Sequence, residues 1–228
     1  MPITYDDIAS FLAPLYCADL PESEPTASVA MILGKPSKEL ELLLMQRTID
    51  RRDPWSGNLA FPGGRIKKNE NPRRAAERET LEEVGLKLRN SRCLGRLPDI
   101  SGAHLPVNVA CFVYALENGE GRTVRPNHEV HDVFWIGVDQ LAAPQRHIVA
   151  TVTFDGKKMK MPAISIPRPG IPVLWGLTYR MVVMFLEAVG MLPSDIRMEK
   201  SFAELPEKRY EHGYAMPLSS RDCMNKAC

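Results

Sequence analysis

The chain has 228 residues, enough for one large domain or two small ones with a substantial hydrophobic core. Its apolar fraction of 44% and charged fraction of 25% are those of an average globular protein, which argues against disorder, collagen-like repeats and long coiled coils. A formal net charge of +1 argues against a uniformly basic surface, so we expect no nucleic-acid partner.

The first residues predict a short amphipathic helix. Thr4 can cap it, Asp6 and Asp7 would lie in its first turn, and apolar residues follow at helical spacing. A proline-rich linker over residues 21–25 separates this helix from the rest of the chain.

Apolar runs between turn-forming residues predict the strands. They cover residues 27–33, 41–45, 59–61, 107–116 and 133–136. Two further strands, 151–154 and 157–161, are expected because they flank Asp155-Gly156, which predicts a hairpin. A single helical turn is expected at 139–141. After a loop over 167–172, Pro172 is expected to begin a longer helix that ends near Val189.

Strands and helices in this order predict an α/β fold. We divide the chain into an N-terminal helix and linker (1–26), a main domain (27–192) and a polar C-terminal tail (193–228).

Cysteine usage and N-terminal charge predict the compartment. The five cysteines include no Cys-x-x-Cys pair, which indicates reduced thiols rather than disulfides or a zinc site. Residues 1–46 hold seven acidic residues, two lysines and no arginine, the reverse of a mitochondrial transit peptide. The most apolar stretch, 171–192, contains Arg180 and Glu187 and so predicts a buried helix rather than a membrane span. No signal-peptide core or C-terminal peroxisomal address is seen, and we expect a cytoplasmic protein without a membrane partner.

Residues 71–84 predict a helix with well-marked ends. Asn71 can cap it, Pro72 suits its first position, and Gly85 can adopt the left-handed conformation just after it. Within this helix, spacings of three and four residues place the acids Glu79, Glu82 and Glu83 on one face.

Like charges at this spacing repel by about 0.2–0.5 kcal/mol per pair on an exposed helix. Either solvent with neighbouring arginines or bound divalent cations can remove this cost. The preceding Gly63-Gly64 favours a ligand site, because glycines allow a close approach to the backbone.

Read as a string, Gly64-x5-Glu70-x7-Arg78-Glu79-Thr80-x-Glu82-Glu83-x-Gly85-Leu86 resembles the 23-residue box of the Nudix hydrolase family without a gap. Thr80 stands where that pattern prefers a bulky aliphatic residue. The resemblance implies an α/β/α sandwich with a mixed sheet. It also implies hydrolysis of a small-molecule diphosphate with Mg²⁺ or Mn²⁺.

Carried over by position, the resemblance implies a role for each acid of the box. Glu79, Glu82 and Glu83 would hold the metal and, with Arg78, form the catalytic set. Arg78 would orient a glutamate, and Glu70 would brace the turn before the helix or act from behind the metal ligands. Glu129, outside the box, is another candidate for the base that takes the proton of the attacking water. The identity of that base stays open.

Residues before the box resemble the signature of the coenzyme A diphosphatase branch of this family. The G-x3-F-P-G-G half is intact, but four residues rather than three separate Arg52 from Gly57, so the extra residue falls in the 51–55 loop. We expect the substrate to be bound by Arg47, Arg52, Gly57, Phe61, Gly63 and Gly64, with Arg51 as a further guanidinium for the phosphates of coenzyme A.

The resemblance therefore predicts cleavage of coenzyme A, or of its acyl or oxidised forms, to adenosine 3′,5′-bisphosphate and (acyl-)4′-phosphopantetheine. Two alternatives stay open. One is hydrolysis of another nucleoside diphosphate derivative, such as ADP-ribose, a dinucleotide or an oxidised nucleotide. The other is a non-catalytic binding module, which usually has a damaged box.

His128 and His131 lack further nitrogen or sulfur ligands nearby and are expected at the surface. A homodimer stays open as the assembly.

Overall fold

The fold comes from a computed structural model, which describes residues 3–18, 24–34, 39–50, 53, 55–101, 107–116, 123–154, 157–194, 196 and 207–208. The predicted Arg51, Arg52, Asp155 and Gly156, and most of the tail, lie outside these residues.

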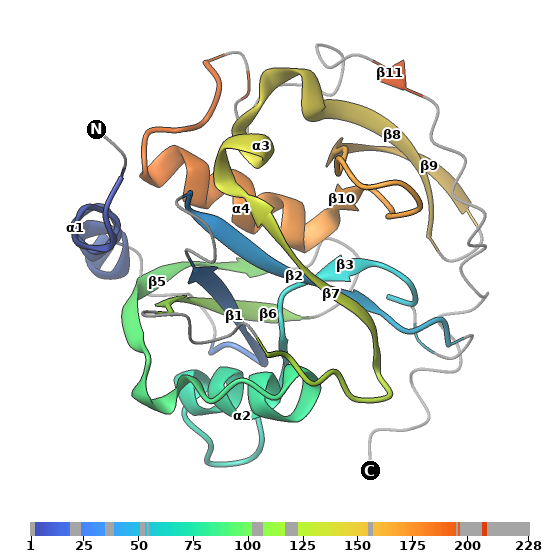
Figure 1. Ribbon diagram of the computed structural model, residues 1–228. Helices are drawn as coiled ribbons and strands as arrows, with labels where there is room; N and C mark the ends of the chain where they lie inside the picture. The colour runs from blue at the N-terminus through green and yellow to red at the C-terminus, as the bar shows by residue number, and fades with distance from the viewer. Residues whose placement is uncertain are drawn as a thin grey trace.

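A mixed sheet forms the centre of the protein (Figure 1). Its strands are β1 (Ala27–Gly34), β2 (Glu41–Arg47), β3 (Leu59–Ala60), β4 (Gly63–Arg65), β5 (Arg92–Ser101), β6 (Asn108–Ala115) and β7 (Val130–Gly137). The order is β3-β2-β1-β6-β5, with β4 paired to the start of β1 and β7 to β2. Strands β1 and β6 are parallel and the other pairs are antiparallel.

Helices cover both faces of this sheet. Helix α2 (Pro72–Val84) packs on one face, over a core that includes Ala30, Phe112 and Tyr114. Helices α1 (Tyr5–Ala18) and α4 (Gly176–Ala188) pack into the larger core on the other face. Every residue of β6 is buried, as a central strand covered on two sides requires. The predicted α/β class with a mixed sheet between helices is confirmed.

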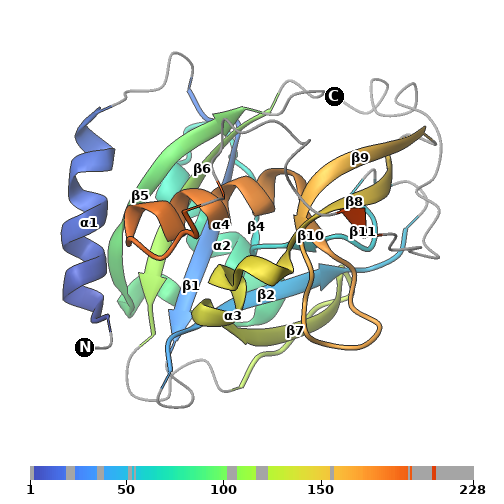
Figure 2. The ribbon, with the colours of Figure 1, turned by 90° about the horizontal axis from the view of Figure 1, so that it is seen from above.

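A second sheet lies beside the first (Figure 2). It contacts the first sheet at β3. It contains β8 (His147–Phe154), β9 (Lys157–Ile164), β10 (Leu174–Trp175) and β11 (Glu207–Lys208), in the order β10-β9-β8-β11. Strands β8 and β9 are antiparallel, which confirms the predicted hairpin. The short helix α3 (Val138–Ala142) and 3-10 turns at Leu88–Asn90 and Pro144–Arg146 complete the regular structure of the described residues.

The N-terminal helix is confirmed, together with its cap. Thr4 Oγ1 accepts the Asp7 N–H at 3.1 Å, and Asp7 Oδ2 accepts the Thr4 N–H at 2.9 Å. These reciprocal bonds satisfy donors that a helix start leaves without intrahelical partners. Helix α1 then packs along β5, and an added Cβ at Gly95 would lie 2.8 Å from Leu12 Cβ.

The prediction that Pro172 begins a helix is wrong. Leu174 and Trp175 instead form β10, paired with Ile164 and Ala163, and α4 begins at Gly176 with a φ of +70°. Residues 174–175 pair with the edge of β9, and this pairing outweighs the helical pattern that begins at Pro172. Strand β5 has no clear signal in the sequence, because a register shift between Leu97 and Ile100 breaks its alternation.

Strand β7 is longer than the expected 133–136, since it pairs with β2 over Val130–Gly137. Met181 and Phe185 of α4 lie in the core, in agreement with the buried helix that the apolar stretch 171–192 predicts. None of the helices in the described residues has the length and hydropathy of a bilayer-spanning segment.

Removal of the Leu12 side chain should loosen the contact between α1 and β5. Leu12 is fully buried, whereas its neighbour Phe11 is 48% exposed. We expect Leu12→Ala to lower the free energy of unfolding by about 2–5 kcal/mol, and Phe11→Ala by about 0.5 kcal/mol or less. Urea denaturation of the two variants measures this difference, and equal losses would contradict the packing described.

Candidate active site

Helix α2 is held at both ends by the residues that the sequence marks as caps. Asn71 Oδ1 accepts the Arg73 N–H at 2.9 Å, and the Gly85 N–H donates to the Leu81 carbonyl at 3.2 Å with φ +75°. A helix fixed in this way gives its acidic side chains defined directions.

The glycine pair allows β4 to make close contacts with β1 and with the Glu79 side chain. In β4, Gly63 and Gly64 pair with Val29 and Ser28 of β1. A Cβ at Gly63 would lie 2.4 Å from the Ser28 carbonyl oxygen, and one at Gly64 would lie 2.7 Å from the Glu79 carboxyl carbon. Any other residue at either position would therefore push Glu79 or the strand pairing out of place.

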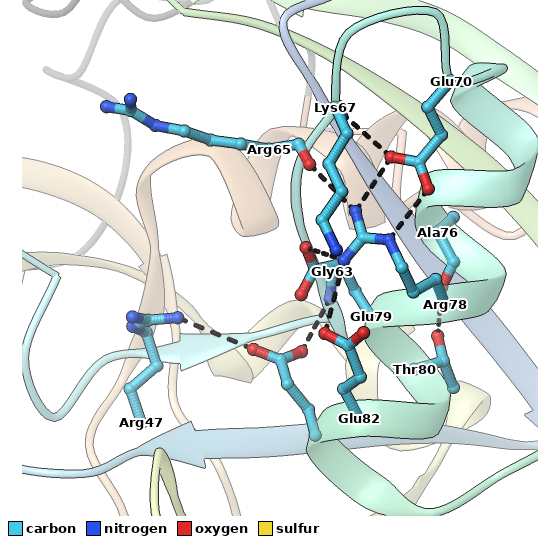
Figure 3. A network of polar contacts seen from close by, with 11 residues as sticks. Arg47, Gly63, Arg65, Lys67, Glu70, Ala76, Arg78, Glu79, Thr80 and Glu82 are labelled. Carbon is cyan, nitrogen blue, oxygen red and sulfur yellow. Dashed lines mark hydrogen bonds and ion pairs between the residues drawn. The ribbon is translucent and has the colours of Figure 1, made fainter. Parts of the chain in front are cut away.

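Arg78 is the centre of a polar network on this side of α2 (Figure 3). Its guanidinium donates to Glu70 at 2.8 and 2.9 Å, to the Arg65 carbonyl at 3.2 Å, to Glu79 at 2.6 Å and to Glu82 at 3.3 Å. The Arg78 bonds hold the pKa of Glu70 at about 2, and the pKa of Arg78 lies above its ordinary value mainly because of Glu70. All three acids thus share one fixed cation.

Glu83 instead contacts one residue of β4 and one residue of β2. Its Oε2 accepts the Gly63 N–H at 2.8 Å, and its Oε1 lies 4.0 Å from Arg47 Nη1. The residue is 3% exposed, and this burial raises the pKa of Glu83 to about 7, although the Gly63 bond and Arg47 act in the opposite direction.

The acidic set suits a hard divalent cation in its chemistry. Glu79 Oε1 and Glu82 Oε2 converge on one Arg78 nitrogen, so these two carboxylates can already share a single cation in this backbone arrangement. Within the part of the chain that the structure describes, no three acidic, histidine or cysteine residues are grouped closely enough to hold a metal ion. Glu83 lies apart from that pair because Gly63 and Arg47 hold it.

The other expected site residues lie in different surroundings. Arg47 is bound by Asp53, with Nε and Nη2 at 2.8 and 2.7 Å from Asp53 Oδ2. Gly57 has a φ of +71° in a turn, and its carbonyl accepts the Gln46 amide. Phe61 is 3% exposed and packs in the larger core. Arg52 is among the residues that are not described.

Glu129 and the two histidines lie at the surface. Glu129 is exposed in the segment before β7, near enough to Glu83 to contribute to the raised pKa of that carboxyl. His128 and His131 are exposed, as predicted.

Two residues that the sequence did not single out support the site. Asp53 fixes Arg47, and its place in the loop with the extra residue gave no signal of this role. Glu77 is 8% exposed on the inner side of α2, where it accepts bonds from Arg73, Arg74 and Tyr114. The spacings of Glu77 from the two arginines, four and three residues, are typical of helical ion pairs and could have indicated this cluster.

The NUDIX domain family matches residues 24–154, which include β1, the Gly63-Gly64 pair and all of α2. Nudix hydrolase 3 of Caenorhabditis elegans is 31% identical over 125 residues, 52% of this chain and 48% of that protein. Uncharacterized protein C14C4.10c of Schizosaccharomyces pombe is 37% identical over 93 residues, 32% of this chain and 28% of that protein. The chain thus aligns with about half or less of the length of these relatives.

Solved structures of this kind are also similar. A MutT/nudix family protein from Enterococcus faecalis has a TM-score of 0.49 at 21% identity, covering 80% of this chain and 69% of that one. A C. elegans Ap4A hydrolase binary complex has a TM-score of 0.42 at 22% identity, covering 50% and 80%.

The pair of Glu70 and Arg78 should stabilise the fold in a pH-dependent way. The pKa of Glu70 lies below its ordinary 4.5, so the stabilisation is complete above pH 4.5 and is lost as the pH falls toward 2. We expect Glu70→Gln to be less stable than the wild type by about 1 kcal/mol at pH 7, and by less than about half of that at pH 3. Urea denaturation at both pH values tests this.

Glu24→Gln, at an exposed position before β1, is the matched control and should show no such difference. A deficit of Glu70→Gln that is the same at pH 7 and pH 3 would mean that the charge of Glu70 is not what stabilises the turn.

Proposed function

Because the chain belongs to the NUDIX domain family, we propose that it hydrolyses the diphosphate bond of a small molecule with the help of Mg²⁺ or Mn²⁺. The observation that carries this proposal is the convergence of Glu79 and Glu82 on one cationic nitrogen, directly beside the Gly63-Gly64 backbone. The phosphates of an anionic substrate and the cations can then lie close to the Gly63-Gly64 backbone, where no side chain occupies the space.

Cations are required by the chemistry of the substrate. A diphosphate repels an attacking hydroxide, and a bound divalent ion would neutralise that charge and lower the pKa of water. Glu79, Glu82 and Glu83 are the residues proposed to hold it. Arg78 orients Glu79, and Glu70 in turn keeps Arg78 in place through two bonds. The Gly63 N–H fixes one oxygen of Glu83 and leaves the other toward Arg47.

Coenzyme A or its derivatives are the proposed substrates, with adenosine 3′,5′-bisphosphate and (acyl-)4′-phosphopantetheine as products. The intact Gly57-x3-Phe61-Pro62-Gly63-Gly64 string supports this choice. Arg47, half-buried beside Glu83, supplies a guanidinium for a substrate phosphate.

ADP-ribose is the second candidate because of Asp53. This carboxylate binds the Arg47 guanidinium at 2.7 Å and so offsets part of the positive charge that a 3′-phosphate would use. ADP-ribose has no 3′-phosphate, so the reduced positive charge at Arg47 weakens its binding less.

A substrate panel should separate the two candidates. Purified protein with Mg²⁺ is incubated with coenzyme A, ADP-ribose and nucleoside triphosphates, and the products are resolved by chromatography. We expect adenosine 3′,5′-bisphosphate to accumulate from coenzyme A. Turnover of ADP-ribose with coenzyme A intact would refute the preferred substrate, and no turnover of any compound would refute the proposed activity.

Glu83→Gln should lower kcat by at least about 100-fold while the protein stays folded, because the amide cannot serve as an anionic ligand or accept a proton. Glu187→Gln, exposed on α4, should keep the wild-type rate. Circular dichroism verifies the fold of both variants. A normal rate for Glu83→Gln would remove this residue from the proposed site.

Chelation should remove the activity reversibly. With EDTA in excess we expect hydrolysis to fall to background, and addition of Mg²⁺ or Mn²⁺ beyond the chelator should restore it. Full activity in the presence of EDTA would contradict the metal requirement.

A further inference from the structure

Three aromatic side chains from separate parts of the chain gather where the two sheets meet. Trp55 precedes β3, Phe154 ends β8, and Trp175 lies in β10. The ring centroids of Trp55 and Phe154 are 5.6 Å apart at 43°, and those of Phe154 and Trp175 are 6.3 Å apart at 79°. All three residues are only partly buried. We refer to Trp55, Phe154 and Trp175 as the aromatic platform.

The platform is connected to the proposed diphosphate site by two residues. Asp53 binds the Arg47 guanidinium through one carboxylate oxygen, and its other oxygen accepts the backbone N–H of Trp55 at 3.0 Å. Asn58 accepts the Arg47 N–H at its carbonyl at 3.0 Å and the Trp175 Nε1–H at its side chain at 3.2 Å. Asp53 thus links Arg47 to Trp55, and Asn58 links Arg47 to Trp175. The Nη1 atom of Arg47 lies 4.0 Å from Glu83 Oε1.

The same segment leads directly to Gly63 at the start of β4. From Asn58 the chain forms β3 and then reaches Gly63. The Thr178 hydroxyl at the start of α4 donates to the Leu59 carbonyl at 3.2 Å, which ties this segment to the second sheet. Residues Asp53 and Asn58 thus join Arg47, on one side of the proposed diphosphate site, to the aromatic platform.

We propose that Trp55, Phe154 and Trp175 form the subsite for the nucleobase of the substrate. This inference rests on the proposed function, because it places one end of that diphosphate compound. A planar base gains stability by stacking on an indole or phenyl ring, and such stacking tolerates different bases. The Trp175 N–H is already bound to Asn58, so the ring offers its apolar surface rather than a free donor.

An aliphatic chain fits this surface less well than a base. Aliphatic groups need only apolar area, whereas the platform has its rings at angles of 43° and 79°, which presents ring faces and edges in different directions. The pantetheine arm of coenzyme A is accordingly assigned away from the platform, and its binding there is an outcome of the test.

Calorimetry on the full chain with Mg²⁺ tests the subsite without relying on turnover. The probes are AMP, ribose 5-phosphate and 4′-phosphopantetheine. We expect Trp55→Ala to weaken AMP binding about tenfold and Trp55→Phe to stay within about threefold of the wild type, because phenylalanine retains a stacking face. The affinities for ribose 5-phosphate and 4′-phosphopantetheine should change less than about twofold.

Phe11→Ala, an aromatic truncation at an exposed position of α1, is the matched control and should leave all three affinities unchanged. Unchanged AMP binding in Trp55→Ala would overturn the proposal, as would an equal loss for AMP and ribose 5-phosphate. A loss confined to 4′-phosphopantetheine would assign the platform to the other arm and overturn it as well. If Trp55→Ala fails to fold, Trp55→Leu, which keeps apolar volume without a ring, is measured instead and should show the same selective loss.

The outcome of this test can be told apart from the outcome of the activity assay. A protein that hydrolyses no diphosphate but loses AMP affinity in Trp55→Ala keeps the subsite and refutes the reaction. Hydrolysis of coenzyme A with AMP binding unaffected by Trp55→Ala keeps the reaction and refutes the subsite.

Discussion

The contact between the Gly64 backbone and the Glu79 carboxylate is the constraint on which the site depends. A methyl group at Gly64 would lie 2.7 Å from the carboxyl carbon of Glu79, so the carboxylate can keep its position only while this residue is glycine. The carboxylates of Glu79 and Glu83 thus lie next to the backbone of Gly64 and Gly63. The caps at Asn71 and Gly85 make this arrangement reproducible, since they fix where α2 begins and ends.

Charge is distributed around this contact in a way that the net charge of +1 conceals. Arg78 neutralises the outer acids Glu70, Glu79 and Glu82, whereas Arg47 lies on the opposite side, near the buried Glu83. Each arginine is itself fixed by an acid outside the proposed metal set, Glu70 for Arg78 and Asp53 for Arg47. The site is therefore a network in which cations and anions alternate, and a bound cation would compete with Arg78 for the carboxylates that it already gathers.

The second sheet contacts the segment that binds Arg47 of this network. Its strand β10 touches β3, and the residues at that junction hydrogen-bond both to Arg47 and to Trp175. Asp53 and Asn58 thus each contact Arg47, which lies near the charged residues of α2, and one tryptophan of the aromatic platform.

The sequence by itself determined α2, its caps and the acids on it, because helical periodicity, capping residues and spacing act over a few neighbouring residues. It likewise determined strands β1, β2, β3 and β6 and the β8–β9 hairpin, whose signals are local, but not β5. Only the tertiary structure decided what depends on distant partners. The pairing of Leu174 with Ile164 replaced an expected helical start, Glu83 turned to Gly63 and Arg47 rather than to Glu79, and Asp53 became the partner of Arg47. The aromatic platform belongs to the same group, since its rings come from positions 55, 154 and 175, and no local pattern brings such distant positions together.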